Sequence, residues 1–339
     1  MVPAARIIRL VVAYSLCLYY NVKFILLLIL GYLLKGHTQF LEVKERPTPP
    51  KALQDPRYGN HKYITVNGIK LHYVEKGDQN KPLMLFVHGF PEFWYSWRHQ
   101  IVEFSKDYWC VAIDMRGYGD SDKPTGLKPY KIDNMVDDVR ELVKALNRDL
   151  FTLVCHDWGA VIGWRYLLRY MNTVEKYVMI GAPAVEVYGV VAQREWDQFR
   201  KGWYVFFFKA PIVPEISLRT NDLGVFEAMK TGSTTAEDIE AFKYTFQKRD
   251  ALTYPLNYYR ANGFGAVPRI KSKPEKYAPG LFLLGEKEQY ISLSTGAAME
   301  KAYPNLTYKL VPGATHFAQQ DKPTLVNEMM RKFLASSHK

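Results

Sequence analysis

"LVCHDWGAVIGW", from Leu153 to Trp164, is the stretch that decides the fold of this 339-residue chain. A short apolar strand ends there in a sharp turn, and small residues then open a helix, with Asp157 at the tip. Small residues around the tip let strand and helix approach closely and project the tip side chain outward. An Asp between a strand and a helix is commonly a simple N-cap. The flanking His156, Trp158 and Gly159–Ala160 favour instead a nucleophile elbow.

Apolar runs on both sides of this elbow alternate with helical patterns. Nearly unbroken apolar runs are typical of strands buried on both faces of a parallel sheet. Asn67–Gly68, between two alternating segments, predicts a hairpin. The alternation of strand and helix predicts an α/β fold with a mostly parallel central sheet. The strands are expected at Tyr63–Val66, Ile69–Val74, Pro82–His88, Cys110–Met115, Phe151–Cys155, Tyr177–Ile180, Gly280–Glu286 and Tyr308–Gly313.

This alternation breaks at residues 183–267, where the sequence is helical and aromatic. Thr234 and Glu237 fit a capping box that opens one of the helices. The strand pattern then resumes in residues 268–339. An insertion between two parts of one sheet predicts a helical cap over the carboxyl edge, where open α/β sheets bind ligands. Residues 62–182 and 268–339 are thus expected to form the core, and 183–267 the cap.

The first residues have a different character. Leu10–Leu34 is apolar and long enough to cross a bilayer at about 1.5 Å per residue. Within it, Asn21 and Lys23 are costly near a bilayer centre. No small-residue cleavage site follows, so residues 1–36 are expected to be a single-pass membrane anchor, with a hairpin or interfacial segment as the alternative. Residues 37–61, rich in proline and polar side chains, are expected to be a linker.

The orientation of this anchor is left open by the sequence, because basic residues flank it on both sides. Asn305-Leu306-Thr307 is a glycosylation sequon, and a glycan there would place the domain in the lumen. The net charge of +11 comes without a long basic run or a zinc-finger spacing, so nucleic acid is not an expected partner. The three scattered cysteines predict neither a disulfide nor a metal site.

Two further segments follow predicted strands at the edge that carries the elbow. "HGFPEFWYSW" begins at His88, and the turn around Gly89 and Pro91 is expected to aim the Phe90 amide at the site. With the Trp158 amide it predicts a two-donor oxyanion hole, a simple strand-to-helix turn being the alternative. "PGATHFAQQDKP" carries His316 after the last strand, in the order nucleophile, acid, histidine that is typical of α/β hydrolases.

A carboxylate after the penultimate strand is the candidate acid. Glu288 in "LLGEKEQYIS" could hold His316 in its useful tautomer and stabilise its charged form. Glu286, two residues upstream, competes with it, and a solvated surface position is the alternative for either.

With these motifs in order, the chain from about Tyr63 to the end resembles the epoxide hydrolases of the α/β-hydrolase fold. The segments similar to family motifs are "HGFPEFWYSW", "RGYGDSDKP", "HDWGA" and "GATHFAQQDKP". The membrane-anchored animal members are especially similar because they also begin with a hydrophobic segment. This resemblance implies that the protein is located in the endoplasmic reticulum membrane. Two departures are Glu288, where many soluble relatives have Asp, and Ala160, where a second Gly is frequent.

The resemblance implies that two cap tyrosines hydrogen-bond to the epoxide oxygen. By local context these are Tyr204 in "WYVFFFKAP" and Tyr259 in "LNYYRANG". Tyr258 competes with its neighbour, and aromatic packing is the alternative for Tyr204. Phe90 and Trp158 are also expected to contact the substrate.

The implied activity is hydrolysis of lipophilic epoxides, such as epoxy fatty acids, to vicinal diols through an ester on Asp157, within lipid metabolism and without a metal or organic cofactor. A haloalkane dehalogenase would share the Asp nucleophile. The paired tyrosines and the lack of an Asn after Gly89 favour the epoxide. A catalytically silent membrane-anchored scaffold is the alternative from another class.

Overall fold

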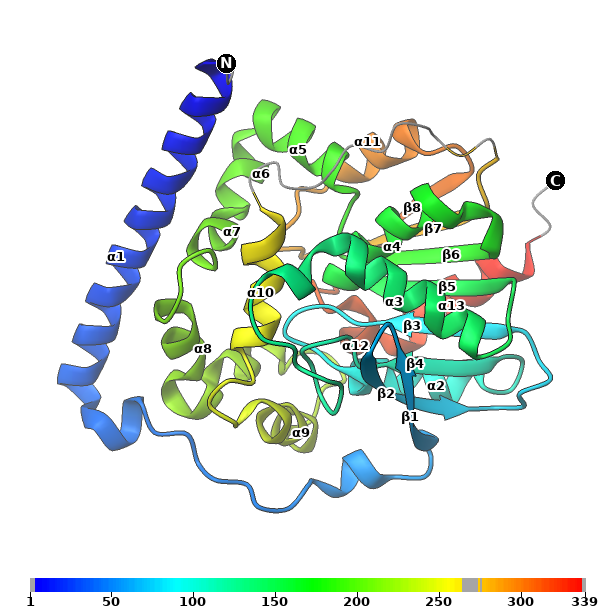
Figure 1. The fold of residues 1–339 in the computed structure, drawn as a ribbon, viewed down its shortest axis with the longest axis horizontal. Coiled ribbons are helices and arrows are strands. Elements are labelled where there is room, and N and C mark those ends of the chain that lie inside the picture. The colour runs from blue at the N-terminus through cyan, green and yellow to red at the C-terminus, as the bar shows by residue number, and fades with distance from the viewer. Residues whose placement is uncertain (1–3, 264–273, 275, 337–339) are drawn as a thin grey trace.

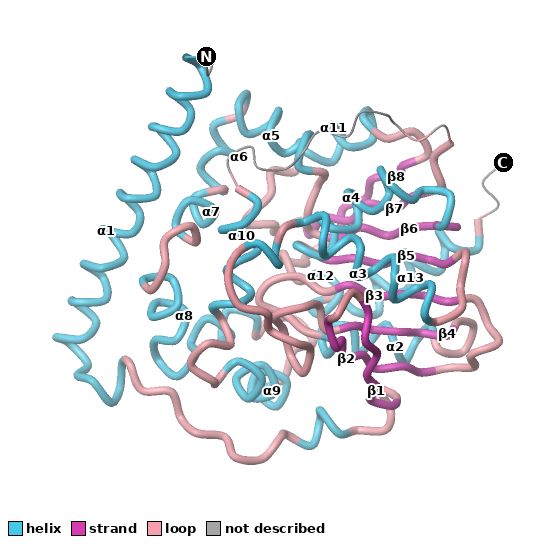
Figure 2. Tube along the Cα trace, in the orientation of Figure 1, coloured by secondary structure: helices cyan, strands magenta, loops and turns pink. Residues whose placement is uncertain are grey.

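The computed structural model describes residues 4–263, 274 and 276–336. Within them, one eight-stranded sheet has the order β1-β2-β4-β3-β5-β6-β7-β8 (Figures 1 and 2). The strands are β1 (Asn60–Val66), β2 (Ile69–Lys76), β3 (Leu83–Val87), β4 (Trp109–Ile113), β5 (Phe151–His156), β6 (Val174–Ile180), β7 (Gly280–Gly285) and β8 (Leu306–Val311).

Strand pairing confirms the predicted fold class. β1 and β2 form an antiparallel hairpin through Asn67 and Gly68, both with positive φ, and β2 pairs antiparallel with β4. Every other neighbouring pair in this sheet is parallel. β3, β4, β5 and β7 are buried along their whole length, which is why their sequences are almost purely apolar.

Helices cover both faces of the sheet. α3 and α4 pack together in front of it in the view of Figure 1, and α2 packs with α13. α3 buries Met135, Val139, Leu142 and Val143, the apolar stripe that its sequence carries. The core helices are α2 (Arg98–Phe104), α3 (Ile132–Ala145), α4 (Trp158–Tyr170), α11 (Ser294–Ala302), α12 (Ala318–Asp321) and α13 (Pro323–Ala335).

Helices inserted between β6 and β7 form the cap at one side of the sheet (Figure 1). Val267, its predicted last residue, lies outside the described residues. The cap helices are α5 (Val185–Arg194), α6 (Trp196–Lys201), α7 (Trp203–Phe207), α8 (Val213–Leu223), α9 (Ala236–Phe246) and α10 (Thr253–Asn262).

The capping box of α9 lies one residue later than predicted. Thr235, not Thr234, accepts a hydrogen bond from the backbone N–H of Asp238, whose carboxylate accepts one from the Thr235 N–H. Asp238 is held there by Arg98 at 3.0 Å and by the Tyr95 hydroxyl at 2.7 Å. These contacts with the core determine the residue at which the helix begins. A local sequence pattern cannot indicate them, because Tyr95 and Arg98 are far from α9 in the sequence.

The N-terminal apolar segment is the long helix α1 (Ala4–Phe40), which lies beside α7 and α8 of the cap (Figure 1). Gly36 interrupts it with a left-handed backbone, φ 72°. Within the described residues, Leu10–Phe40 is the one helix long and apolar enough to cross a membrane, with a mean hydropathy of 1.9. Residues 41–59 then run under the cap to β1 (Figure 1).

Candidate active site

Asp157 lies at the tip of a sharp turn between β5 and α4. Its backbone has φ 49° and ψ −118°, a conformation that a residue with a side chain rarely adopts. A Cβ on Gly159 would come within 2.2 Å of the Val87 carbonyl oxygen, so only glycine permits this approach of α4 to β3. Ala160, the departure from the family pattern, is fully buried in α4. The elbow thus fixes the Asp157 carboxylate at the carboxyl edge of the sheet.

His316 bridges two carboxylates. Its Nε2 lies 3.4 Å from Oδ2 of Asp157, and its Nδ1 lies 2.9 Å from Oε2 of Glu288. The second Glu288 oxygen accepts a hydrogen bond of 2.8 Å from the Tyr290 N–H. Glu286 is exposed and accepts a hydrogen bond from the Gly313 N–H, so the structure pairs His316 with Glu288.

The two glutamates offer a matched pair of variants. We expect Glu288→Gln to lower turnover by about 10²-fold or more, because the amide neither stabilises the imidazolium nor fixes the useful tautomer. Glu286→Gln is expected to retain turnover within about twofold, since an exposed side chain far from reacting atoms changes little. Steady-state turnover of both variants is the measurement, and equal losses in the two would contradict this assignment.

The Phe90 amide points at the elbow. Its N–H donates a hydrogen bond of 2.8 Å to Oδ1 of Asp157. Trp158 is the first residue of α4, and N–H groups of a first helical turn have no acceptor within their helix. The Trp158 amide is therefore free of a helical partner next to the Asp157 tip, and with the Phe90 amide it is the candidate pair for binding a developing oxyanion.

Two cap tyrosines face the carboxylate. Tyr204 of α7 and Tyr259 of α10 line the same cavity as Asp157, with ring centroids 6.0 Å apart. The Tyr258 hydroxyl instead donates a hydrogen bond of 2.7 Å to the Arg116 carbonyl. The structure therefore places Tyr259 in the cavity and gives its neighbour a structural partner.

The cavity has a volume of about 320 Å³ and is lined mostly by apolar and aromatic side chains, Phe90 among them. A second cavity of about 120 Å³, which Trp158 lines, meets it at Asp157, Tyr204 and Tyr259. The two cavities are thus two arms of one site, and Asp157, Tyr204 and Tyr259 lie where the arms join. Within the described residues, no group of three or more His, Cys, Asp or Glu side chains could hold a metal ion.

Neighbouring charges shift the pKa values of these groups. Burial alone would raise the pKa of Asp157, but the His316 imidazole beside it holds the pKa below its ordinary value. Burial alone would lower the pKa of His316, but Glu288 and Asp157 together raise it well above its ordinary value. Burial, aided by the Asp157 charge, raises the pKa of Tyr204 and Tyr259 well above that of a free tyrosine.

Sequence reasoning missed a buried pair beneath the site. The Glu92 carboxylate lies 2.6 Å from His156 Nδ1 and accepts a hydrogen bond from the Gly89 N–H. His156 Nε2 donates to the His316 carbonyl oxygen at 3.0 Å. The pair joins the loop of Phe90, the elbow and the histidine loop. Its signal was present, because both residues stand inside the quoted motifs.

Two aromatic residues of the cavity were also missed. Tyr290 lines it, and its ring packs edge-on against His316 at 4.9 Å between centroids. Phe24 lines the same cavity from α1, far from every other lining residue in the sequence. Only the spacing of Tyr290 from Glu288 could have indicated the first, and no local pattern indicates the second.

Comparison with known proteins places this geometry in a family. A family profile described as alpha/beta hydrolase fold matches residues 82–323. Epoxide hydrolase 1 of Caenorhabditis elegans is 38% identical over 326 residues, which cover 93% of this chain and 79% of the relative. Epoxide hydrolase 4 of Homo sapiens is 36% identical over 323 residues, covering 91% and 88%.

Solved structures agree with these relatives. An epoxide hydrolase of Bacillus megaterium, crystallised with an inhibitor, has a TM-score of 0.74 and 32% identity, over 81% of this chain and 100% of that one. An epoxide hydrolase from Vigna radiata has a TM-score of 0.71 and 30% identity, over 83% and 99%. The chain therefore belongs to the alpha/beta hydrolase fold family and, within it, to the epoxide hydrolases.

Proposed function

We propose that this enzyme hydrolyses lipophilic epoxides to vicinal diols through a covalent ester on Asp157. The observation that carries the proposal is the grouping of three chemical parts around one apolar cavity: the Asp157 carboxylate, the His316–Glu288 pair and the Tyr204 and Tyr259 rings. A carboxylate suits an sp³ carbon as nucleophile because the resulting ester can be hydrolysed in a second step.

In the first step, a carboxylate oxygen of Asp157 bonds to a ring carbon of the epoxide, and the bond from that carbon to the ring oxygen breaks. The ring oxygen leaves as an alkoxide and takes the phenolic proton of Tyr204 or Tyr259. The raised pKa of both tyrosines keeps them protonated until this stronger base forms.

In the second step, His316 becomes a base. Esterification removes the charge of Asp157, one of the two carboxylates that raise the pKa of His316, so this pKa falls. Its proton passes to the tyrosinate, and the neutral imidazole then takes a proton from the water that attacks the ester carbonyl. The amides of Phe90 and Trp158 stabilise the tetrahedral oxyanion, and its breakdown releases the diol and restores the carboxylate.

The two arms of the site favour substrates with apolar groups on both sides of the epoxide, such as epoxy fatty acids. The larger arm is lined by Phe208, Leu218 and Met229, and the smaller by Val161 and Ile291. Apolar linings bind hydrocarbon chains without desolvating polar groups. Attachment to the endoplasmic reticulum membrane through α1 would keep such an enzyme near lipid substrates, in lipid metabolism.

One turnover in ¹⁸O-labelled water, with enzyme in excess over epoxide, tests the ester. Label is expected in the Asp157 carboxylate and not in the diol, because water attacks the ester carbonyl and the diol keeps the aspartate oxygen. Trypsin releases Asp157 and Asp149 on one peptide, 149–165, so fragment-ion masses must distinguish the two carboxylates. Label in the diol alone would show direct attack of water on the epoxide and overturn the proposal.

A further inference from the structure

α1 touches the cap along one stripe of its surface. The residues of α1 that the protein covers wholly or in part recur at intervals of three or four, and they include Ala13, Cys17, Tyr20, Phe24, Leu28 and Gly31. This spacing puts them on one face of a helix. The large apolar side chains of its other faces are exposed, which distinguishes α1 from a core helix.

Specific contacts hold this stripe on α7. The Asn21 side chain donates a hydrogen bond of 3.2 Å to the Phe207 carbonyl, in a buried position. Phe24 stacks on Phe207 with centroids 4.0 Å apart and on Trp203 at 5.4 Å. Asn21 is one of the two residues that make this segment a poor membrane span, and docking on the cap adds a second hydrogen-bond acceptor to the Cys17 carbonyl of its own helix.

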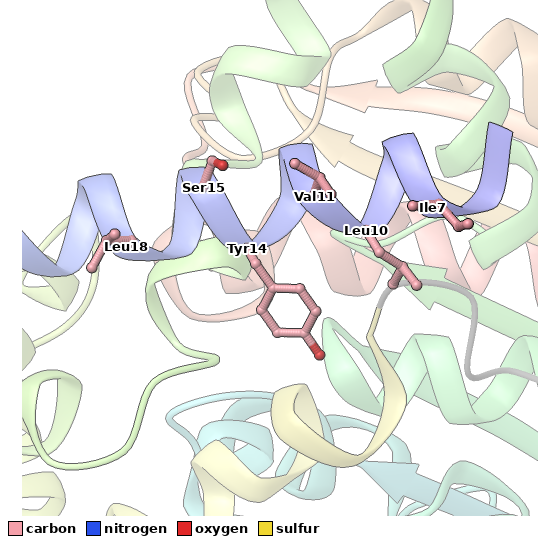
Figure 3. A pocket seen from close by; sticks show the side chains of 6 residues that line it. All are labelled: Ile7, Leu10, Val11, Tyr14, Ser15 and Leu18. Carbon is pink, nitrogen blue, oxygen red and sulfur yellow. The ribbon is translucent and has the colours of Figure 1, made fainter. Parts of the chain in front are cut away.

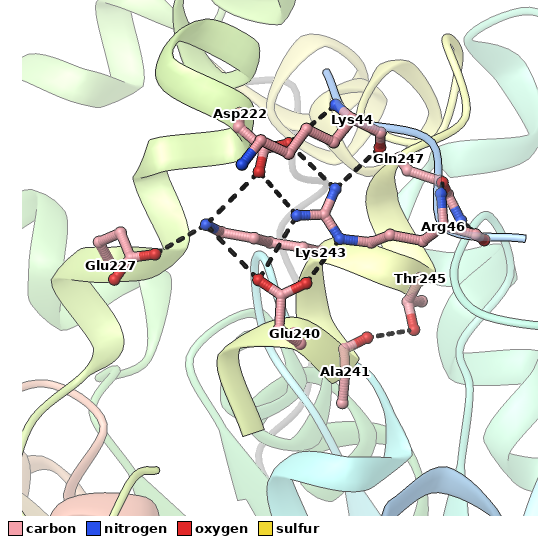
Figure 4. A network of polar contacts seen from close by, with 9 residues as sticks. All are labelled: Lys44, Arg46, Asp222, Glu227, Glu240, Ala241, Lys243, Thr245 and Gln247. Carbon is pink, nitrogen blue, oxygen red and sulfur yellow. Dashed lines mark hydrogen bonds and ion pairs between the residues drawn. The ribbon is translucent and has the colours of Figure 1, made fainter. Parts of the chain in front are cut away.

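The segment after α1 is tied to the same side of the cap (Figure 4). Lys35 donates a hydrogen bond to Asn221 at 2.8 Å, just before the break at Gly36. Arg46 then pairs with Asp222 at 2.7 Å and with Glu240 at 2.8 Å, and only 11% of its side chain is exposed. The C-terminal end of the docked stripe is thus fixed to the cap by polar contacts.

This docking is incompatible with a helix that crosses the bilayer. From Ala13 to Lys35 the docked part of α1 is about 33 Å long, as long as the bilayer hydrocarbon core is thick. If it crossed, α7 and α8, which pack against it, would cross beside it and carry Glu215 and Arg219 into hydrocarbon. Burying such charges in a membrane costs several kcal/mol each, about 2.5 or more at the centre.

The chemistry of the uncovered side of α1 fits a bilayer. Figure 3 shows six side chains of its first half, Ile7, Leu10, Val11, Tyr14, Ser15 and Leu18, which line a groove of about 440 Å³ along the helix. Of these, Ile7, Val11 and Leu18 are more than half exposed. Further along, Leu26, Leu30, Leu33 and Leu34 are each more than half exposed. Residues 1–41 contain no acidic residue, whereas Arg6, Arg9 and Lys23 are basic. An apolar face with basic residues is typical of helices that lie in the interface of anionic membranes.

The docked stripe is also a wall of the catalytic cavity. Phe24 lines the cavity that contains Asp157 and His316, together with Trp203 and Phe207, the two rings on which it stacks. Aromatic side chains of α1 and α7 therefore form part of the wall of the cavity that holds the reacting carboxylate.

We propose that α1 lies in the plane of the membrane surface, docked on the cap with its outer face in the lipid, and that epoxides enter the cavity from the bilayer past Phe24. The proposal favours the interfacial alternative over the single-pass anchor and makes α1 part of the substrate entrance. The proposed entrance depends on the proposed function, because that function supplies the substrate. The proposed placement of α1 does not depend on it.

Cysteine labelling of the full chain in sealed vesicles tests the placement. Ala5→Cys marks the first turn of α1 and Glu328→Cys an exposed position of α13, each with Cys17→Ala to remove the half-buried thiol. A membrane-impermeant maleimide is expected to treat the two variants alike, labelling both before detergent or both only after it. Labelling of one before detergent and of the other only after it would show that α1 crosses the membrane and overturn the proposal.

Substrate selectivity tests the entrance. Phe24→Ala is expected to change kcat/KM for a long-chain epoxide presented in phosphatidylcholine vesicles by about tenfold relative to that for a short water-soluble epoxide. Leu310→Ala, at an exposed position of β8 outside the cavity lining, should leave this ratio within twofold. Equal ratios in both variants would overturn the entrance. Failure of the parent enzyme to form any diol would instead contradict the proposed function, and the labelling result would still stand.

Discussion

Asp157→Ala is expected to lower diol formation by about 10⁴-fold or more, because removal of a covalent nucleophile leaves only binding and positioning to act on the substrate. The aromatic walls and the tyrosine hydroxyls remain in this variant, so we expect the epoxide still to bind. The measurement is kcat with a lipophilic epoxide, paired with a binding assay for the same compound.

Asp149→Ala is the matched control, since Asp149 is an exposed aspartate just before β5, the strand that ends at the elbow. It should keep turnover within about twofold, as surface substitutions away from a site usually do. Thermal unfolding of both variants separates loss of chemistry from loss of fold. Turnover by a folded Asp157→Ala protein at more than a few per cent of the parent rate would exclude the ester mechanism.

The core could be predicted from the sequence because its determinants are local. The Asn67–Gly68 turn needs two residues with positive φ, and the elbow needs Gly159 beside the Val87 carbonyl, so both leave a pattern within a few positions. Buried strands such as β3 and β5 are apolar throughout. Asp157 and His316 could also be predicted to lie at one edge of the sheet, because each follows a parallel strand and parallel strands end at the same edge.

What could not be predicted depends on contacts between distant segments. The choice between Glu286 and Glu288 depends on which carboxylate turns toward His316. The two residues are only two positions apart after β7, so their sequence positions do not decide it. Phe24 reaches the cavity because α1 docks on a helix more than 170 residues later, through Asn21 and Phe207. A hydropathy average detects only that the segment is apolar. Its value is the same whether the helix crosses a bilayer or lies on its surface.

His316→Gln is expected to separate the two chemical steps. Attack by Asp157 on the epoxide does not require a base, whereas hydrolysis of the resulting ester requires a neutral imidazole to take a proton from water. The variant should therefore react once and stop, with turnover lowered by about 10³-fold or more. The intact mass of the protein should rise by the mass of one epoxide, and the added mass should map to the peptide 149–165.

Glu288→Gln provides an internal comparison for this experiment, because it keeps the imidazole but removes the carboxylate that supports its charge. It should accumulate the same ester more transiently, with hydrolysis slowed rather than abolished. His37→Gln, at an exposed histidine after the break in α1, should show neither trapped ester nor lost turnover. If His316→Gln stayed unmodified in excess epoxide while remaining folded, His316 would be needed for the first step, and its assignment as the base of the second would be wrong.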